Sequence, residues 1–435
     1  MLLDCPPDGI REYQCNAMIT PANRRLRVLL SEGGSTSARQ AITVLGLAGH
    51  HVEICDPAPL CLGRFSRFVR AVHRCPPLRR DPAGYLDYVT ELLAARRFDV
   101  LLPIHEQGLV FARAVDRIAA LTGVALPSYG GYRTAVTKAG FSRLLESLGL
   151  PQPPTRIVTS EAELREAARP PCVIKTSVGT ASRGVWRVFD QATLDQAVRE
   201  LVAADGFAGE VLVQDFVAGR IEHAQAVFDR GALLALHAYR QVASGAGGGP
   251  ARKLSTRSDE IRQDVATIGA ALRWHGALSF DLIRPVNDAR PLYIDCNPRL
   301  VEPMSAQLAG LDLVDLLLRL SLGEHPPAAA PPRDGVRSHL GMQALLGCAL
   351  GGGTRRDVMR ECARLMLRQP PYAGSAEELT PVRQDWFSAV PLAATALILL
   401  AQPSRAAALA AKGWGDHLLD AAALKQIDQG FGQEA

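Results

Sequence analysis

The stretch YIDCNPRLVEP, residues 293–303, begins like a buried strand yet carries an acid, an amide and a guanidinium at alternating positions. Side chains at positions i, i+2 and i+4 of a strand share one face. Asp295, Asn297 and Arg299 are therefore expected to project together, while Ile294 turns into the core. The pattern predicts a charged ligand in front of this strand.

A second strand precedes this one, and the two are predicted to form a hairpin. LSFDLI and LYIDCN flank the segment PVNDARP, whose Asn287 and Asp288 are typical of a tight turn. Asp281 and Asp295 lie equally far from that turn. They are expected to face each other across the two strands, with Asn297 further along the same face.

Two opposed carboxylates need compensation by positive charge, because each raises the pKa of the other unless a cation lies between them. Mg²⁺ suits such a site, since it is a hard cation that also binds the phosphates of a nucleotide. A second interpretation stays open, in which Asp281 and Asp295 only form ion pairs with Arg299 or Arg284.

Composition and charge exclude several classes of protein. The chain has 435 residues, more than one core usually supports, so two or three domains are expected. Its net charge of +4 comes from scattered basic residues, apart from RFSRFVRAVHR at 64–74, which argues against a nucleic-acid-binding protein. The nine cysteines form no closely spaced pair, and the N-terminus lacks the apolar core of a secretory leader. We therefore expect a cytoplasmic protein without a disulfide framework.

One segment raises the question of a membrane span. WFSAVPLAATALILLAQ, residues 386–402, carries no charge but lies at the short limit for crossing a bilayer. Pro391 and several polar residues favour a buried helix instead, so no membrane span is expected.

The pattern of apolar residues divides the chain into four parts. Residues 1–25 are predicted to be an irregular extension. Residues 26–130 alternate short apolar runs with helical periodicity, which predicts a Rossmann-like parallel sheet of the doubly wound type. Residues 131–325 hold strand pairs with interposed helices and are predicted to form an α+β domain. Residues 326–435 are rich in Ala, Leu and Arg and are predicted to be mostly helical.

Two glycine-rich turns are candidates for binding phosphate. Gly33 and Gly34 lack the spacing of a dinucleotide fingerprint and of a P-loop, which favours a structural turn and argues against a Rossmann oxidoreductase. The loop TSVGTASRG could cradle phosphate oxygens beside Lys175, although flexible hairpin loops share this composition. Lys138 lies in the first turn of a helix that begins after Thr137, where positive charge opposes the helix dipole and suggests a ligand.

Taken in order, these pieces resemble the ATP-grasp superfamily. The resemblance runs from about residue 131 to 325 and rests on Lys138, PCVIKTSVGTASRGV, VLVQDFVAGRIE, LSFDLI and YIDCNPRLVEP. The last stretch is similar to the metal-binding signature of the family, in the form found in its biotin carboxylase and carbamoyl phosphate synthetase branches. The family usually has Glu where this chain has Asp295, which shortens the reach of the carboxylate to the metal.

The resemblance implies a site for ATP and one or two Mg²⁺ ions, with Mn²⁺ as a possible substitute. It implies that the phosphates contact Lys138, Lys175 and the loop with Gly179, Ser182 and Gly184. Adenine would contact Gln214 or Asp215 and the backbone of Val217, and the ribose would contact Glu222. Asp281, Asp295 and Asn297 would bind the metal, and Arg299 would neutralise the charge of the transferred phosphoryl group. Arg240 and Lys253 are expected to bind a carboxylate substrate or its acyl phosphate. A solvated surface loop explains these last two residues equally well.

The implied activity is that of an ATP-dependent carboxylate–amine ligase, in which an acyl phosphate forms and an amine then displaces phosphate. Two alternatives stay open. One is a carboxyphosphate-forming carboxylase or carbamoyl-phosphate-type enzyme, and the other is a regulatory nucleotide-binding module without turnover. Small-molecule carboxylate and amine substrates are expected, with no nucleic-acid partner. The helical C-terminal part could support a homodimer.

Overall fold

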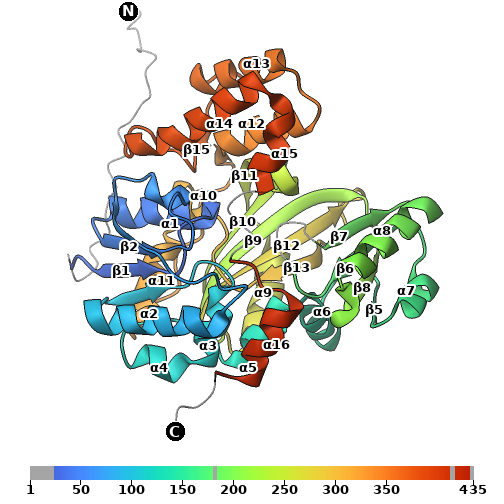
Figure 1. The fold of residues 1–435 in the computed structure, drawn as a ribbon, viewed down its shortest axis with the longest axis horizontal. Helices are drawn as coiled ribbons and strands as arrows, with labels where there is room; N and C mark the ends of the chain where they lie inside the picture. Colours follow the sequence, from blue (N-terminus) through green and yellow to red (C-terminus); the bar gives the residue numbers. More distant parts are fainter. Residues whose placement is uncertain (1–23, 180–183, 412–416, 432–435) are drawn as a thin grey trace, which may run out of the picture.

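The computed structural model describes residues 24–179, 184–411 and 417–431 of the chain. Three β-sheets organise them: a small parallel sheet near the N-terminus, a large central sheet and a third sheet at the outer edge (Figure 1). The expected mixture of α/β and α+β structure is confirmed. The predicted extension at 1–25 falls almost entirely outside the described residues.

The first sheet is parallel, and its strands lie in the order β3-β2-β1-β4. Its elements are β1 (Arg27–Leu30), α1 (Thr36–Leu47), β2 (His51–Cys55), β3 (Val69–His73), α2 (Pro82–Arg96) and β4 (Val100–Leu102). This order confirms the predicted doubly wound sheet. β3 lies within the basic run at 64–74, where arginines interrupt the apolar pattern of a strand.

Four short helices follow the first sheet. They are α3 (Gln107–Arg113), α4 (Val115–Ala119), α5 (Tyr129–Val136) and α6 (Lys138–Ser147). α6 begins directly after Thr137, as predicted. The Thr137 hydroxyl donates to the carbonyl of Arg133, and the backbone N–H of Lys138 donates to the carbonyl of Ser177 at 2.8 Å. The start of α6 is thus tied to the segment that leads into the glycine loop.

The third sheet forms a small lobe with a core of its own. Its strands lie in the order β5-β8-β6-β7. The elements are β5 (Thr155–Val158), α7 (Glu161–Ala167), β6 (Cys172–Thr176), β7 (Val185–Val188), α8 (Gln191–Ala203) and β8 (Val211–Asp215). Ile174 is buried with Leu164 of α7 and Leu201 of α8, so the next residue of the strand, Lys175, projects from the opposite face.

The central sheet has seven strands in the order β13-β12-β9-β10-β11-β14-β15. Five of its strands are β9 (Gly219–Asp229), β10 (Ala232–Ser244), β11 (Pro250–Thr256), β12 (Gly276–Pro285) and β13 (Leu292–Asn297). The same stretch of chain contains the helices α9 (Asp259–Leu272), α10 (Pro303–Leu308) and α11 (Leu313–Ser321). The last two strands, β14 (Arg337–His339) and β15 (Ala376–Glu377), come from the C-terminal part. The C-terminal part therefore completes a sheet that the preceding region begins.

The remainder of the C-terminal part is mostly helical, as predicted. Its helices are α12 (Gly341–Leu350), α13 (Arg355–Met366), α14 (Ala389–Ala401), α15 (Ala406–Ala411) and α16 (Ala421–Gln429). Figure 1 shows α12 to α15 gathered at one end of the molecule, whereas α16 returns and packs against α2 and α3. α16 thus lies beside the helices of the N-terminal sheet.

α14 corrects the expectation of a buried helix at 386–402. Leu399 is the one buried residue of this helix, and Leu397 is 67% exposed. Among the helices that the structure describes, none combines the length and apolar character needed to cross a bilayer. Leu392, Ala396 and Leu400 pack partly buried against the neighbouring helices, whereas Leu397 faces outward. Homodimerisation stays a prediction.

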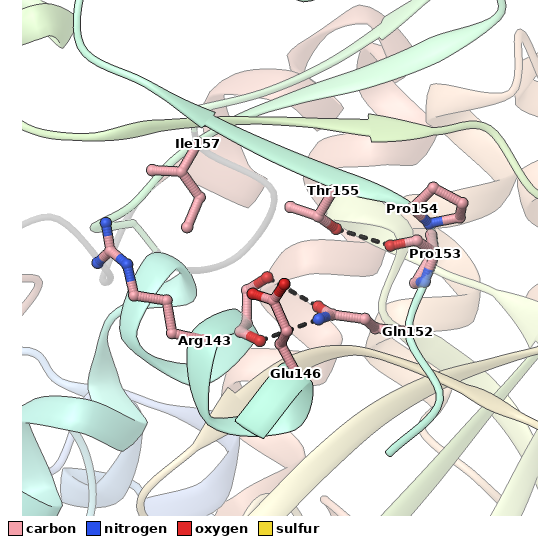
Figure 2. Close-up of a pocket in the computed structure, with 8 residues that line it drawn as sticks. Arg143, Glu146, Gln152, Pro153, Pro154, Thr155 and Ile157 are labelled. Atoms are coloured by element: carbon pink, nitrogen blue, oxygen red, sulfur yellow. Dashed lines mark hydrogen bonds between the residues drawn. The ribbon is translucent and has the colours of Figure 1, made fainter. Parts of the chain in front are cut away.

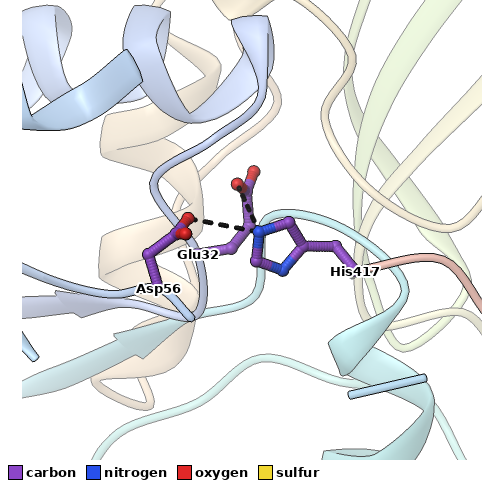
Figure 3. A group of neighbouring side chains, drawn as sticks. All are labelled: Glu32, Asp56 and His417. Carbon is purple, nitrogen blue, oxygen red and sulfur yellow. Dashed lines mark hydrogen bonds and ion pairs between the residues drawn. The ribbon is translucent and has the colours of Figure 1, made fainter. Parts of the chain in front are cut away.

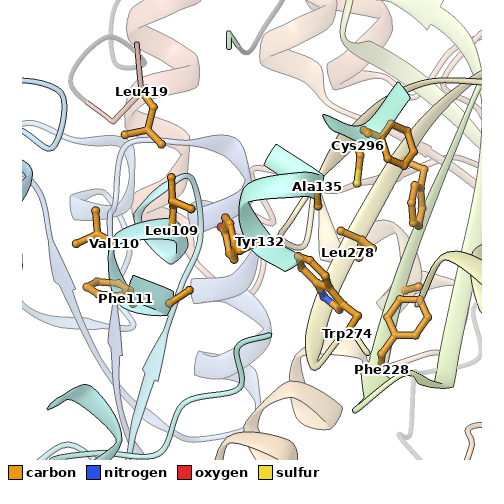
Figure 4. Close-up of a cluster of buried hydrophobic side chains, with 14 of the residues drawn as sticks. Leu109, Val110, Phe111, Tyr132, Ala135, Phe228, Trp274, Leu278, Cys296 and Leu419 are labelled. Atoms are coloured by element: carbon orange, nitrogen blue, oxygen red, sulfur yellow. The ribbon is translucent and has the colours of Figure 1, made fainter. Parts of the chain in front are cut away.

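The two faces of the central sheet differ in chemistry. One face buries apolar side chains such as Leu278 and Phe228, which pack with Trp274 and Tyr132 in a core that also receives α16 (Figure 4). Side chains alternate along a strand, so the neighbours of these residues point the other way. That second face carries Asp281 and the other polar side chains discussed below.

A buried ion pair ties the C-terminal part to the first sheet. Asp385 is fully buried and accepts from Arg39 at 2.7 Å, from the Ser66 hydroxyl at 2.5 Å and from the backbone N–H of Arg67 at 2.9 Å. Burial lowers the pKa of Arg39, and the charge of Asp385 opposes that shift. The carboxylate thus compensates a guanidinium that solvent does not reach.

We predict that Asp385→Asn lowers the free energy of unfolding by about 3–5 kcal/mol, because it leaves the Arg39 charge buried without compensation. Urea denaturation followed by circular dichroism measures the loss. Asp87→Asn is the matched control, since the Arg117–Asp87 pair is exposed and its removal should cost about 1 kcal/mol or less. Equal losses in the two variants would contradict the importance of the buried pair.

Candidate active site

The predicted hairpin exists, and its register brings the two acids together. β12 and β13 pair antiparallel with Asp281 opposite Asp295, as predicted. The register shifts directly after this pair, which leaves Ile294 as the extra residue of a β-bulge. Ile294 is half-buried, which corrects the expectation that it turns into the core. Asn297 follows on the strand, and its Nδ2 lies 3.5 Å from Asp281 Oδ2.

His223 of β9 completes the surroundings of Asp281. Its Nδ1 lies 2.7 Å from Asp281 Oδ1, and its ring stacks on Tyr239 with 4.9 Å between centroids. Burial raises the pKa of Asp281, but the hydrogen bond and charge of His223, together with the charges of Arg299 and Lys175, hold that pKa below its ordinary value. The carboxylate is therefore ionised at neutral pH. Sequence reasoning missed His223, which lies opposite Asp281 in the pairing of β9 with β12.

Two lysines from outside the hairpin face the acids. Lys138 Nζ lies 3.4 Å from Asp295 Oδ2 and also donates to the carbonyl of Gly179. Lys175 Nζ donates to the carbonyl of Ile294 at 2.9 Å. Both lysines are buried. The structure therefore brings together the two lysines and the two acids that the sequence nominated for phosphate and metal.

Among the described residues, neither of the arginines that offered an alternative explanation forms an ion pair with Asp281 or Asp295, although the charge of Arg299 acts on Asp281. Arg299 donates to Asn297 Oδ1 at 2.9 Å, and Arg284 pairs with Glu222 at 2.9 Å. The carboxylates instead contact His223, Asn297, Lys138 and the backbone N–H of Cys296, so a hard divalent cation would share their oxygens with these donors. Asn297 presents its amide nitrogen to Asp281 here, so it would join the ligand set only after its amide turns over.

The glycine loop between β6 and β7 is described at its two ends. Gly184 has a φ of +72°, and a Cβ there would lie 2.2 Å from Thr176 Oγ1, so this position requires glycine. The backbone N–H of Thr176 donates to the carbonyl of Gly184 at 2.9 Å and closes the loop. Gly179 carries the carbonyl that meets Lys138. Ser182 lies outside the described residues, and its phosphate contact stays a prediction.

The predicted adenine contacts lie at the end of β8. Gln214 is buried, and its Nε2 donates to Thr155 Oγ1 at 2.9 Å. Asp215 is exposed and Val217 is half-buried. Asp215 is thus the more accessible of the two side chains between which the sequence did not decide.

Glu222 and Arg240 are not brought to the acid pair. They are partners in the β9–β10 register and share a face, whereas His223, the next residue after Glu222, points to the side of Asp281. Glu222 accepts from Arg220 at 2.9 Å and from Arg284, and Arg240 is exposed. The predicted ribose and substrate contacts of these two residues remain without structural support.

Lys253 shares the face of His223 but is enclosed by two acids. It forms ion pairs with Glu302 and, at 2.6 Å, with Glu378, and its Nζ lies 4.9 Å from the centre of the Tyr239 ring. Burial lowers the pKa of Lys253, but the two carboxylates outweigh burial and raise it. Sequence reasoning missed Glu378, which comes from the C-terminal part. The two acids leave one of the three ammonium donors of Lys253, and its predicted contact with a substrate stays a prediction.

A pocket of about 450 Å³ opens between α6 and β5 (Figure 2). Arg143, Glu146 and Gln152 contribute to its walls, and Gln152 is held by Ser142 through hydrogen bonds of 2.8 and 2.9 Å. Its lining contains neither the lysines nor the acids described above. We therefore place the candidate active site at the hairpin and not in this pocket.

Comparison with solved structures identifies the fold. The chain matches an ADP complex of N5-carboxyaminoimidazole ribonucleotide synthetase with a TM-score of 0.58 and 15% identity, over 79% of this chain and 86% of the other. It matches an L-amino acid ligase from Bacillus licheniformis with a TM-score of 0.52 and 17% identity, over 69% and 75%. The chain has the ATP-grasp fold.

A third similar structure is the biotin carboxylase domain dimer of 2-oxoglutarate carboxylase from Hydrogenobacter thermophilus, in complex with MgADP, ADP and bicarbonate. The TM-score is 0.56 and the identity 15%, over 72% of this chain and 74% of the other. No protein-family model and no curated protein matches the chain. The ATP-grasp fold predicted from the motifs is thus confirmed by structure alone.

Within this ATP-grasp fold, we predict that Asp281→Asn and Asp295→Asn each weaken Mg²⁺-dependent ATP binding by at least about tenfold, or about 1.4 kcal/mol. Each change removes a charge assigned to the metal. Asp295→Glu should retain most of the affinity, because it keeps the charge and restores the usual residue of the family. Calorimetric titration with ATP, in the presence and absence of Mg²⁺, measures the effect. An unchanged Mg²⁺ dependence in both Asn variants would exclude the metal assignment.

We also predict that ATP affinity falls as the pH rises through about 8. Burial lowers the pKa of Lys175 to about 8, against the opposing charge of Asp295. Only the ammonium form attracts phosphate, so deprotonation above that pH removes the interaction. Lys175→Arg should abolish the pH dependence, since a guanidinium stays charged. Adenosine, which lacks phosphates, serves as the control ligand, and an equal pH dependence for adenosine would count against this role.

Proposed function

We propose that the chain is an ATP-dependent ligase that joins a carboxylate to an amine. A carboxylate oxygen attacks the γ-phosphorus of ATP, which forms an acyl phosphate and releases ADP. The amine then attacks the acyl carbon, loses a proton and displaces inorganic phosphate, which leaves an amide. ATP with Mg²⁺ is the proposed cofactor, with Mn²⁺ as a substitute.

The arrangement of charge at the hairpin carries this proposal. Asp281 and Asp295 supply hard oxygen ligands, which suit a Mg²⁺–nucleotide complex. Lys138 and Lys175 approach the same acids with two positive charges. Phosphoryl transfer depends mainly on positioning and on neutralisation of charge, and these four side chains support both.

Arg299 is proposed to neutralise the charge that develops during transfer. Its guanidinium is held by Asn297 at 2.9 Å, and its carbonyl accepts from the Ser279 hydroxyl at 2.7 Å. The residue is buried, so its direction is set before any ligand binds. A preorganised charge of this kind favours the transition state, because it needs no rearrangement during the reaction.

A carboxyphosphate-forming enzyme is the second candidate. Two of the similar structures bear on it: one is a carboxyaminoimidazole ribonucleotide synthetase, and the other is a biotin carboxylase domain in complex with bicarbonate. The L-amino acid ligase supports the first candidate. A regulatory nucleotide-binding module without turnover is the remaining alternative. It stays open because this chain has Asp295 where the family usually has Glu. Mg²⁺-dependent ADP formation with any acid and amine would exclude that module.

Oxygen isotopes distinguish the two enzymatic candidates. A screen of carboxylate and amine pairs for ADP release first identifies an active pair. With that pair, we predict that an ¹⁸O-labelled organic acid transfers one labelled oxygen to inorganic phosphate, because the oxygen that attacks phosphorus leaves with it. Mass spectrometry of the phosphate detects the label, and bicarbonate should be dispensable.

The opposite labelling pattern would overturn the ligase proposal. Turnover that requires bicarbonate, with label reaching phosphate from bicarbonate and never from the organic acid, would establish carboxyphosphate as the intermediate. Asp281→Asn provides the background control, since any phosphate labelled in that variant does not come from the candidate active site.

A further inference from the structure

A second cluster of titratable side chains lies at the carboxyl ends of the parallel strands. Glu32 follows β1, Asp56 directly follows β2, and Gln107 begins α3 after β4. Doubly wound sheets bind ligands in the crevice outside these strand ends. In this chain the C-terminal segment enters that region and brings His417 next to both acids (Figure 3).

Glu32, Asp56 and His417 direct one ligand atom each towards a common point. All three are buried, with exposures of 0%, 1% and 4%. His417 Nε2 lies 3.2 Å from Asp56 Oδ2 and 3.8 Å from Glu32 Oε2, and the three ligand atoms lie within 4.8 Å of one another. A tetrahedral ion with bonds of about 2.0–2.2 Å separates its ligands by about 3.4 Å. The spacing therefore fits an ion at the centre of the cluster.

The charge of this cluster is unbalanced without a cation. Gln107 Oε1 accepts from the backbone N–H of His105 at 3.1 Å, which fixes the amide so that its Nε2 donates to His417 Nδ1, also at 3.1 Å. The ring proton therefore resides on Nε2, and the imidazole is neutral. Within the described parts of the chain, no lysine or arginine forms an ion pair with Glu32 or Asp56. The ring donor that the two buried carboxylates share is thus neutral, and their negative charge is not compensated by it. A divalent cation would compensate that charge.

Backbone donors hold both carboxylates in place. The N–H of Gly33 donates to Asp56 Oδ2 at 3.0 Å, and the N–H of Ser35 donates to Glu32 Oε2 at 2.9 Å. A Cβ at Gly33 would lie 2.4 Å from Ile54 Cδ1, so a larger residue there would displace the end of that side chain. These donors act as the outer partners that orient metal ligands in built sites. The Gly33–Gly34 turn thereby orients both carboxylates.

We propose that Glu32, Asp56 and His417 bind a divalent transition metal, best matched by Zn²⁺, which fastens the C-terminal segment to the first sheet. An imidazole nitrogen with two carboxylate oxygens suits Zn²⁺ better than Mg²⁺, which prefers oxygen ligands and keeps its water. Two carboxylates and a divalent ion leave the buried cluster neutral. The site shares no residue with the Asp281–Asp295 pair, and the proposal does not depend on the proposed ligase function.

Gln107 tunes the affinity of this site. When the ion takes its place on His417 Nε2, the ring proton moves to Nδ1, and Gln107 must then accept it. Its amide has to turn over, which breaks the bond from the His105 N–H. Gln107→Glu removes this conflict, because one oxygen keeps that bond while the other accepts from Nδ1–H, as in carboxylate–histidine–zinc triads. This variant should bind the metal more tightly than the natural chain.

The test measures Zn²⁺ bound to the full-length, untagged chain by equilibrium dialysis and elemental analysis, without nucleotide. The natural chain should bind about one equivalent at this site. Glu32→Gln, Asp56→Asn and His417→Ala should each lower the affinity at least about 100-fold, since outer partners alone contribute about 10–100-fold. Gln107→Glu should raise it by about tenfold or more. Because His417→Ala leaves both acids and their backbone donors intact, it keeps the test valid if the acid variants fail to fold.

His325→Ala is the matched control, because His325 is an exposed histidine that also pairs with a carboxylate, at 2.6 Å from Asp229. Its Zn²⁺ affinity should equal that of the natural chain. Co²⁺ in the site should give the visible absorption of a tetrahedral ion, and His417→Ala should abolish it. Failure of the natural chain to retain Zn²⁺, or equal retention by His417→Ala, would overturn the proposal. Since neither nucleotide nor turnover enters this test, its outcome is independent of the ligase proposal.

Discussion

The candidate active site depends on the opposition of two like charges. Asp281 and Asp295 face each other on paired strands, and two like charges at this distance repel unless positive charge lies nearby. His223, Lys138 and Lys175 supply that charge from β9, α6 and β6, three elements that are separate in the chain. The hairpin therefore contacts side chains from each of these three elements. A nucleotide with its metal would enter an electrostatic field that the fold has already arranged.

The hairpin could be predicted because the information that specifies it is local. Alternating side chains and the turn at Asn287 and Asp288 set the register that places Asp281 opposite Asp295. The order of the motifs also nominates both lysines that the structure sets against this pair. Prediction fails where the local pattern is disturbed. The bulge displaces Ile294 from the core, and arginines obscure the strand at 69–73.

The contacts that sequence reasoning missed join residues that lie far apart in the chain. Glu378 reaches Lys253 across 125 positions, and His417 reaches Asp56 across 361. No periodicity encodes such a pair, because closing these loops depends on the whole fold. His223 is an intermediate case, since it lies on a strand of regular pattern but meets its acid only after β9 joins β12. A single sequence thus pairs charged residues within a hairpin, as with Asp281 and Asp295, but not across distant elements.

Buried charged side chains join the C-terminal part to the N-terminal domain, in addition to the apolar packing of α16. Asp385 meets Arg39 and His417 meets Asp56, while Leu397 of α14 stays exposed. A buried charge is costly when its partner is absent, so each contact favours the fully docked arrangement over any partly docked one. Apolar surfaces can pack in many relative positions of the two parts, whereas a buried ion pair forms in only one of them. We infer that they contribute more to the specificity of docking than to net stability. A change of charge in the crevice at the strand ends would therefore act first on how the C-terminal segment is held.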